Sequence, residues 1–205
     1  MDLAKRDGTA SAIPTIDLAV AMRDLSVFEK QRKTAGEIFQ RPIPPFAGDR
    51  KTFIDKIGHA LHAAMIVVYA QGMAVLAAAS DKYNYHLDLE TVARIWRGGC
   101  IIRAVLLEDI RMAYRNQPGL PNLLLAPELS IKVIAHEEDL RRVVCAAIEL
   151  GLPAPCFMTA LAYLDGYRSA WLPANLIQAQ RDYFGAHSYE RIDVKGTFHT
   201  DWTKG

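Results

Sequence analysis

The sequence predicts an all-α protein. Apolar residues recur at steps of three and four along most of the 205 residues, as they do on one face of an amphipathic helix. No segment shows the sustained alternation of a half-buried strand, and neither a GxGxxG motif nor a P-loop is present. We expect a multi-helix domain at residues 13–190, with a disordered N-terminus at residues 1–12 before it and an extended tail at residues 191–205 after it.

The N-terminal part of the domain is expected to be one helical segment, Ile13–Ile38. Leu18 and Met22 lie on one face of it. Pro14 suits the first turn, where a backbone N–H has no helical partner. Three prolines then fall within Gln40–Gly48, so we interpret this stretch as a linker and not as a helix.

The longest helix is expected at Asp49–Ser80. Its middle part, Ala60–Ala79, is apolar nearly all round, which predicts that neighbouring elements bury it on several sides. His62 and Gln71 interrupt this apolar run. We therefore interpret it as a core helix and expect no membrane-spanning segment.

Glycine and proline separate the remaining helices. Asp88 is the expected cap of a helix that runs to the Gly98-Gly99 pair. The tail is polar, with Phe198 and Trp202 as isolated anchors. Further helices are expected at Cys100–Tyr114, Ala126–Leu150, Phe157–Ser169 and Pro173–Phe184.

Composition excludes several classes of function. The formal net charge of +1 gives no general electrostatic attraction to nucleic acid or to an anionic membrane. The three cysteines are odd in number and have no CxxC spacing, which indicates reduced thiols. The first residues do not form the apolar region of a signal peptide. We therefore expect a cytoplasmic protein.

Arg181 and His187 are the main candidates for a binding function. An arginine near a helix end offers a fork of donors for phosphate or carboxylate, and a histidine just beyond the helix can donate to a hydroxyl group. The alternative is structural. Arg181 would then pair with a surface carboxylate, and His187 would pack among neighbouring aromatic rings.

Two other motifs are better explained by structure. The stretch Arg97–Arg103 contains two glycines but follows no strand, so we interpret it as a helix-breaking turn whose arginines pair locally. His59 and His62 lie three positions apart on the long helix, and no acidic or third histidine ligand accompanies them. We therefore expect no metal site.

Several segments, in order along the chain, resemble the C-terminal helical domain of the 6-phosphogluconate dehydrogenase (decarboxylating) family. Together they cover residues 13–203. The segments are Tyr69–Gly72, Ile95–Ala104, Pro118–Leu125, Gly151–Leu161, Asp165–Arg168, Leu172–Tyr189 and Phe198–Thr203.

The resemblance implies a role in NADP-linked oxidation and decarboxylation of 6-phosphogluconate to ribulose 5-phosphate and CO2, in the pentose phosphate pathway. It also implies a homodimer in which the C-terminal tail reaches the active site of the partner subunit. Arg181 would then bind the substrate phosphate in trans, and His187 would contact the sugar acid. A second phosphate-binding arginine falls on Arg23, within Ala19–Ser26.

The sequence also departs from the family. Its dinucleotide-binding domain does not occur in these 205 residues, nor do the lysine and glutamate that act as general base and acid. We therefore expect no catalytic residue in this chain, no dehydrogenase activity from the chain alone, and a possible separate N-terminal Rossmann domain as a partner. The alternative is a non-catalytic helical module used for assembly or for binding a sugar phosphate.

Overall fold

The computed structural model describes residues 11–203 and divides them into two compact units, one up to Leu164 and one from Asp165. Most of the predicted N-terminus lies outside the described residues. The first unit is built from α1 (Pro14–Ser26), α2 (Glu29–Ile38), α3 (Arg50–Tyr83), α4 (Leu89–Gly99), α5 (Leu106–Asn116), the 3-10 turn η1 (Leu123–Leu125), α6 (Pro127–Glu149) and most of α7 (Pro155–Arg168).

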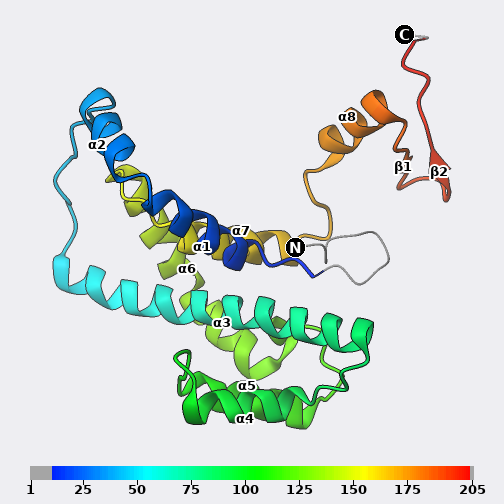
Figure 1. The fold of residues 1–205 in the computed structure, drawn as a ribbon, viewed down its shortest axis with the longest axis horizontal. Coiled ribbons are helices and arrows are strands. Elements are labelled where there is room, and N and C mark those ends of the chain that lie inside the picture. The colour runs from blue at the N-terminus through cyan, green and yellow to red at the C-terminus, as the bar shows by residue number, and fades with distance from the viewer. Residues whose placement is uncertain (1–10, 204–205) are drawn as a thin grey trace. The chain divides into compact units, whose positions relative to one another are not determined.

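The long helix α3 is the centre of the first unit (Figure 1). It begins at the expected place because the Asp49 carboxylate accepts a hydrogen bond from the Thr52 N–H at 2.7 Å and caps the first turn. This bond also lowers the pKa of Asp49. The helix ends at Tyr83 and is capped by Asn84, which takes the left-handed conformation with φ 55°.

The core lies where α3 packs against α6 and η1. Small residues on α3, among them Ala60, Ala63 and Ala70, are fully buried and let the neighbouring helices approach closely. The largest fully buried apolar side chains are Ile66, Val67, Met73, Leu107, Ile110, Leu123, Leu129 and Leu140. By length and composition alone, α3 could cross a membrane, although core helices meet the same criteria.

A buried pair of polar side chains attaches α1 to α3. Gln71 is fully buried, and its amide oxygen accepts from the Thr15 backbone N–H at 3.0 Å. In return, the Gln71 amide nitrogen donates to the Thr15 hydroxyl at 2.9 Å. Because Ile13 offers no capping side chain, Gln71 satisfies the first turn of α1 from another helix.

Two predicted helix boundaries are wrong. The segment 13–38 is two helices, because the chain leaves helical geometry at Phe28, with ψ 47°. The Ser26 hydroxyl bonds back to the Arg23 carbonyl and competes with the regular helical pattern there. The helix expected from Cys100 begins only at Leu106, since Cys100 is extended after the glycine pair.

The second unit contains the end of α7, α8 (Asn175–Gly185) and a short antiparallel pair, β1 (Tyr189–Glu190) and β2 (Thr197–Phe198). Tyr189 is opposite Phe198 in this pair. Strands of two residues carry no detectable sequence period, which is why they were not predicted. The predicted all-α class is confirmed, with this small hairpin as an addition in the tail.

Candidate substrate-binding segment

Arg181 lies on the exposed side of α8, one position before a buried residue. Within residues 11–203 its guanidinium has no ion-pair partner, so the alternative of a surface salt bridge is not realised there. The neighbouring arginines Arg168 and Arg191 are paired, with Asp165 and Asp193 respectively. Arg181 therefore presents a positive charge that a ligand can neutralise.

His187 sits in a sharp turn directly after α8. The residues on both sides of it, Ala186 and Ser188, have positive φ values of 48° and 58°. Residues other than glycine adopt this conformation at a cost of about 1–2 kcal/mol, so other contacts must hold the turn. One such contact runs from the Gln178 amide to the Ser188 carbonyl.

Gly185 makes room for the imidazole of His187. A Cβ atom at position 185 would lie 2.8 Å from Nε2 and 2.9 Å from Cδ2 of the ring. Both distances are far below van der Waals contact. Any side chain at position 185 would therefore push the His187 ring away, and glycine leaves the room that the imidazole needs.

Asp182 holds this turn to the rest of the tail. It is the one buried residue among the described residues from Asp165 onward, with 0% exposure. Its Oδ1 accepts from the Ser188 N–H at 2.9 Å and from His199 Nδ1 at 2.9 Å. Its Oδ2 accepts from the Thr200 N–H and from Trp202 Nε1, both at 3.0 Å. We call these five residues the Asp182 clasp.

The clasp keeps Asp182 ionised. Burial by itself raises the pKa of this carboxyl group. The hydrogen bonds from Thr200, His199, Trp202 and Ser188 oppose burial and lower the pKa to about 2. A lowered pKa is the expected result when one carboxylate accepts hydrogen bonds from several N–H groups at once.

Sequence reasoning did not identify Asp182. Its partners lie between six and twenty positions downstream, at residues 188, 199, 200 and 202, so no helical spacing connects them to it. The only local indication of its role is that an acidic residue lies between Arg181 and Tyr183, both of which are exposed. The predicted anchoring role of Trp202 is explained by its indole N–H, which bonds to the carboxylate, and by its edge contact with Tyr183.

Arg23 is exposed on α1 in the first unit. The structure brings Arg181 and His187 together on one segment, and Arg23 belongs to the separately described unit. The position of Arg23 depends on the Gln71–Thr15 pair, because Thr15 and Arg23 are eight residues, about 12 Å, apart along the same helix.

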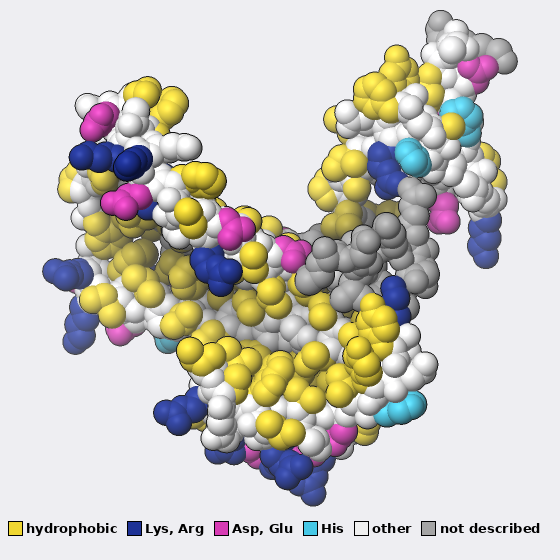
Figure 2. Space-filling model, viewed as in Figure 1, with side chains coloured by type: hydrophobic (Ala, Val, Ile, Leu, Met, Phe, Trp, Pro, Cys, Tyr) yellow, Lys and Arg dark blue, Asp and Glu magenta, His cyan; other side chains and the backbone are white. Residues whose placement is uncertain are grey.

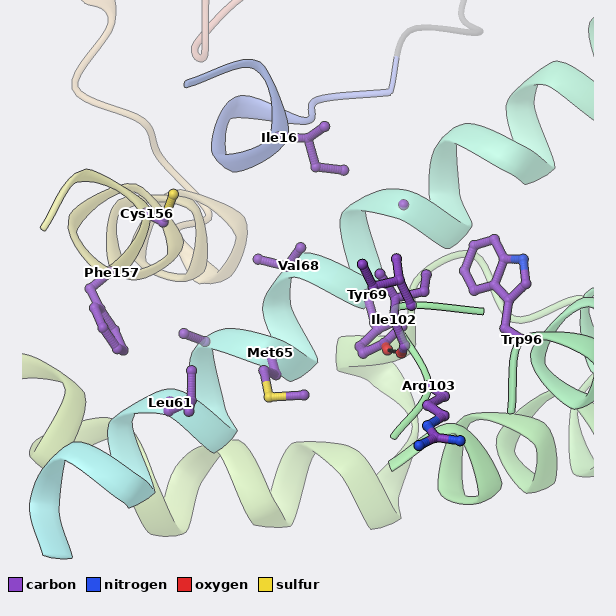
Figure 3. A pocket seen from close by; sticks show the side chains of 13 residues that line it. Ile16, Leu61, Met65, Val68, Tyr69, Trp96, Ile102, Arg103, Cys156 and Phe157 are labelled. Atoms are coloured by element: carbon purple, nitrogen blue, oxygen red, sulfur yellow. Dashed lines mark hydrogen bonds between the residues drawn. The ribbon is translucent and has the colours of Figure 1, made fainter. Parts of the chain in front are cut away.

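The first unit has an apolar groove that the sequence did not predict. It has a volume of about 560 Å³. Figure 3 shows Leu61, Met65 and Val68 along α3, with Cys156 and Phe157 of α7 beside them. Tyr69, Trp96, Ile102 and Arg103 line the other end. Hydrophobic side chains also gather over the middle of α3 in the space-filling view (Figure 2).

The connection from α4 to α5 forms one end of this groove. The Tyr69 hydroxyl donates to the Ile102 carbonyl, and burial raises the Tyr69 pKa. Arg97 pairs with Glu108, which confirms local pairing for that arginine. Arg111 joins Glu108 and Glu90 into the same network. Arg103 instead lies at the groove, without an ion pair in the described part of the chain.

Comparisons with known proteins agree on one family. The model of "6-phosphogluconate dehydrogenase, C-terminal domain" matches residues 8–202. The decarboxylating 6-phosphogluconate dehydrogenase of Synechococcus elongatus is 53% identical over 192 residues, which cover 93% of this chain and 41% of that protein. The Escherichia coli K12 enzyme of the same name is 48% identical over 184 residues, covering 90% of this chain and 39% of that protein.

A solved structure is similar over almost the whole chain. It is Plasmodium falciparum 6-phosphogluconate dehydrogenase, described in its apo form, with its cofactor NADP+ and with its substrate 6-phosphogluconate. The TM-score is 0.87 at 39% sequence identity, covering 98% of this chain and 46% of that one. The chain thus spans about two fifths of the curated relatives' length.

Proposed function

Because the chain belongs to the 6-phosphogluconate dehydrogenase family, whose C-terminal domain it matches, we propose that it is the substrate-binding and dimerisation part of an NADP-dependent 6-phosphogluconate dehydrogenase. The observation that carries the proposal is the segment from Arg181 to His187. It presents an exposed arginine, which has no ion pair within residues 11–203, and a histidine in a turn held by a buried carboxylate.

The chemistry of this segment fits a phosphorylated sugar acid. A guanidinium offers two parallel N–H groups to phosphate oxygens, in a charge-assisted contact stronger than a neutral hydrogen bond. The imidazole of His187 lies beyond the helix end, where it can reach a hydroxyl or carboxylate of the same ligand. Arg23 would be the second cation on the dianionic phosphate.

We propose further that a second copy of the chain completes the site. Large apolar side chains on and before α8 are exposed, among them Trp171 at 74%, Leu176 at 82% and Phe184 at 76%. Figure 2 shows hydrophobic side chains gathered over α8. A surface of this kind is typical of an interface. The tail of one subunit would then bring Arg181 and His187 to the Arg23 of its partner.

The oxidation itself would need residues that these 205 do not supply. NADP is the expected cofactor of the whole enzyme, where it would serve as the hydride acceptor. In this chain no residue is assigned to that step. We expect the chain alone to bind 6-phosphogluconate without reducing NADP, in the cytoplasm. NADPH formation by the purified chain would contradict this expectation.

Calorimetric titration with 6-phosphogluconate tests the binding proposal. We expect saturable binding by the wild-type chain, and a loss of about 100-fold or more in Arg181→Ala, because removing one partner of a charged hydrogen bond costs about 3 kcal/mol. Arg142→Ala is the matched control, since Arg142 is exposed and paired with Glu138 on α6. Gluconate, which lacks the phosphate, should bind weakly to every variant.

The outcomes separate the candidate functions. Equal affinity of wild type and Arg181→Ala for 6-phosphogluconate would exclude the phosphate contact. The absence of any binding by a well-folded dimer would favour the alternative of a helical assembly module. A monodisperse monomer in light scattering would exclude the proposed second copy.

Mixing two defective chains tests whether the site is shared. Chains carrying Arg23→Ala and chains carrying Arg181→Ala should each fail to bind 6-phosphogluconate. If the arginines come from different subunits, a mixed dimer has one site with both arginines intact, and binding returns at one site per mixed dimer. If both arginines come from one subunit, mixing restores nothing.

A further inference from the structure

Three histidines and an aspartate meet on the surface where α3 packs against α6. His59 and His62 come from α3, and His136 and Asp139 come from α6. His59 Nδ1 lies 2.7 Å from Asp139 Oδ2. The His136 ring stacks on the His59 ring at 4.5 Å between centroids and meets the His62 ring edge-on at 5.4 Å.

These side chains are close enough to share one ion. One ligand atom from each of His59, His136 and Asp139 lies within 4.8 Å of the other two. A tetrahedral zinc ion, with bonds of about 2.0–2.2 Å, separates its ligand atoms by roughly 3.3 Å. Rotation of the side chains can supply the remaining shift of up to about 1.5 Å.

The backbone beneath the cluster is fixed. His59 and His62 are each followed by a fully buried alanine, Ala60 and Ala63, and Asp139 is followed by the fully buried Leu140. The ligands would therefore project from two rigid helices of the core. A rigid backbone of this kind holds the ligands near their binding geometry, so that little conformational entropy is lost when the metal binds.

We propose that His59, His136 and Asp139 form a binding site for a divalent transition metal ion such as Zn²⁺, with His62 or water in the fourth position. Imidazole nitrogens favour zinc, nickel and copper, whereas magnesium and calcium favour oxygen ligands. The donors come from two helices, so the bound ion would link α3 to α6. The proposal is independent of the proposed substrate site.

One neighbouring feature bears on the affinity. Lys56 acts against binding, because its ammonium lies 3.1 Å from Asp139 Oδ1 and occupies that carboxylate. Removal of Lys56 should therefore tighten metal binding.

Spacing along the chain does not reveal the whole of this site. His59 and His62 are visible as a helical pair, but His136 and Asp139 lie more than seventy positions downstream on another helix. Only the packing of α3 on α6 brings them together. The prediction that no acidic or third histidine ligand accompanies the pair is therefore wrong, because His136 and Asp139 lie beside it in the folded chain.

Titration of the full 205-residue chain with ZnCl₂ tests the proposal. Calorimetry measures the affinity for zinc, and thermal unfolding measures how much bound zinc stabilises the folded chain. We expect one equivalent of zinc to bind and to raise the melting temperature by a few degrees. His136→Gln and the exposed His59→Gln should each weaken binding at least about tenfold. Lys56→Gln should bind roughly two- to fivefold more tightly.

His86→Asn is the matched control, because His86 is exposed in the turn after α3 and its φ of 51° suits asparagine. Its zinc affinity should equal that of the wild type, and MgCl₂ should give no binding. Zinc affinity unchanged in both His136→Gln and His59→Gln would overturn the proposal. So would zinc binding that is lost on replacing the exposed Cys145 or Cys156 by serine.

Discussion

The unit up to Leu164 and the unit from Asp165 are stabilised by different forces. In the first, a large set of fully buried apolar side chains fills the space between α3, α6 and η1. In the second, the only buried residue among those described is a carboxylate, Asp182, and the order comes from hydrogen bonds to it. Apolar contacts are non-directional, whereas a carboxylate with four donors fixes the direction of each partner.

This difference suits two tasks. The apolar core can stabilise a scaffold, while the Asp182 clasp sets the position of a short segment that carries Arg181 and His187. Changes in the first unit should therefore act on global stability. Changes in the second should act on local order and on ligand affinity.

The largest effect on stability is expected from the core. Leu140→Ala removes a fully buried side chain from α6 and should lower the free energy of unfolding by about 3 kcal/mol in urea denaturation. Ile134→Ala, at a site 72% exposed on the same helix, should change it by less than about 0.5 kcal/mol. Equal effects of the two substitutions would mean that the core does not lie between α3 and α6.

A smaller effect is expected at the polar contact inside the first unit. Gln71→Ala leaves the Thr15 N–H and hydroxyl without their partner and should cost about 2 kcal/mol of unfolding free energy. Thr15→Val removes only the hydroxyl and should cost about 1 kcal/mol. If Gln71→Ala leaves both the unfolding midpoint and the exchange of the α1 amides unchanged, α1 is held by other contacts.

In the second unit, acid should release the tail. The pKa of Asp182 is about 2 in the folded chain, against 3.8 for an ordinary aspartate. A lowered pKa stabilises the folded form above the ordinary value, and this contribution is lost as pH falls toward the folded value. The Trp202 indole N–H signal in NMR should therefore be constant from pH 7 to about 4 and change below it. Its loss between pH 7 and 5 would contradict the assignment of this proton to the Asp182 carboxylate.

The smallest effect on stability is expected at Gly185. Gly185→Ala suits a helix end and should change the unfolding free energy by less than about 1 kcal/mol. It should nevertheless lower the affinity for 6-phosphogluconate roughly five- to tenfold, since the new Cβ displaces the His187 ring. Gly58→Ala on α3, where a Cβ meets open space, is the control and should leave affinity unchanged.

The helices were predictable from sequence because local signals determine them. The cap at Asp88, the start of α3 next to Asp49 and the proline-rich linker after Ile38 were all predicted. The start of α5 was misplaced, because apolar residues continue through 100–105 while the backbone has already left the helix. Periodicity reports which residues are apolar, and it does not report how far beyond the glycine pair the next helix begins.

The candidate site was predictable only in part. Arg181 and His187 were candidates from their residue types, and the family-like segments favoured a role in substrate binding, with which the exposure of Arg181 agrees. The residues that position them, Asp182 and Gly185, act through contacts that depend on tertiary geometry. The same is true of Gln71, whose partner lies 56 positions away.

The affinity of Asp182→Asn for 6-phosphogluconate tests most directly whether the clasp positions the binding segment. Asparagine preserves the size of the side chain but turns one acceptor into a donor that faces the N–H groups of the clasp. We expect at least about tenfold weaker binding than wild type, with the unfolding midpoint of the first unit unchanged. Asp193→Asn, at an exposed carboxylate paired with Arg191, is the control and should bind normally. Wild-type affinity in Asp182→Asn would contradict the role that we assign to the clasp.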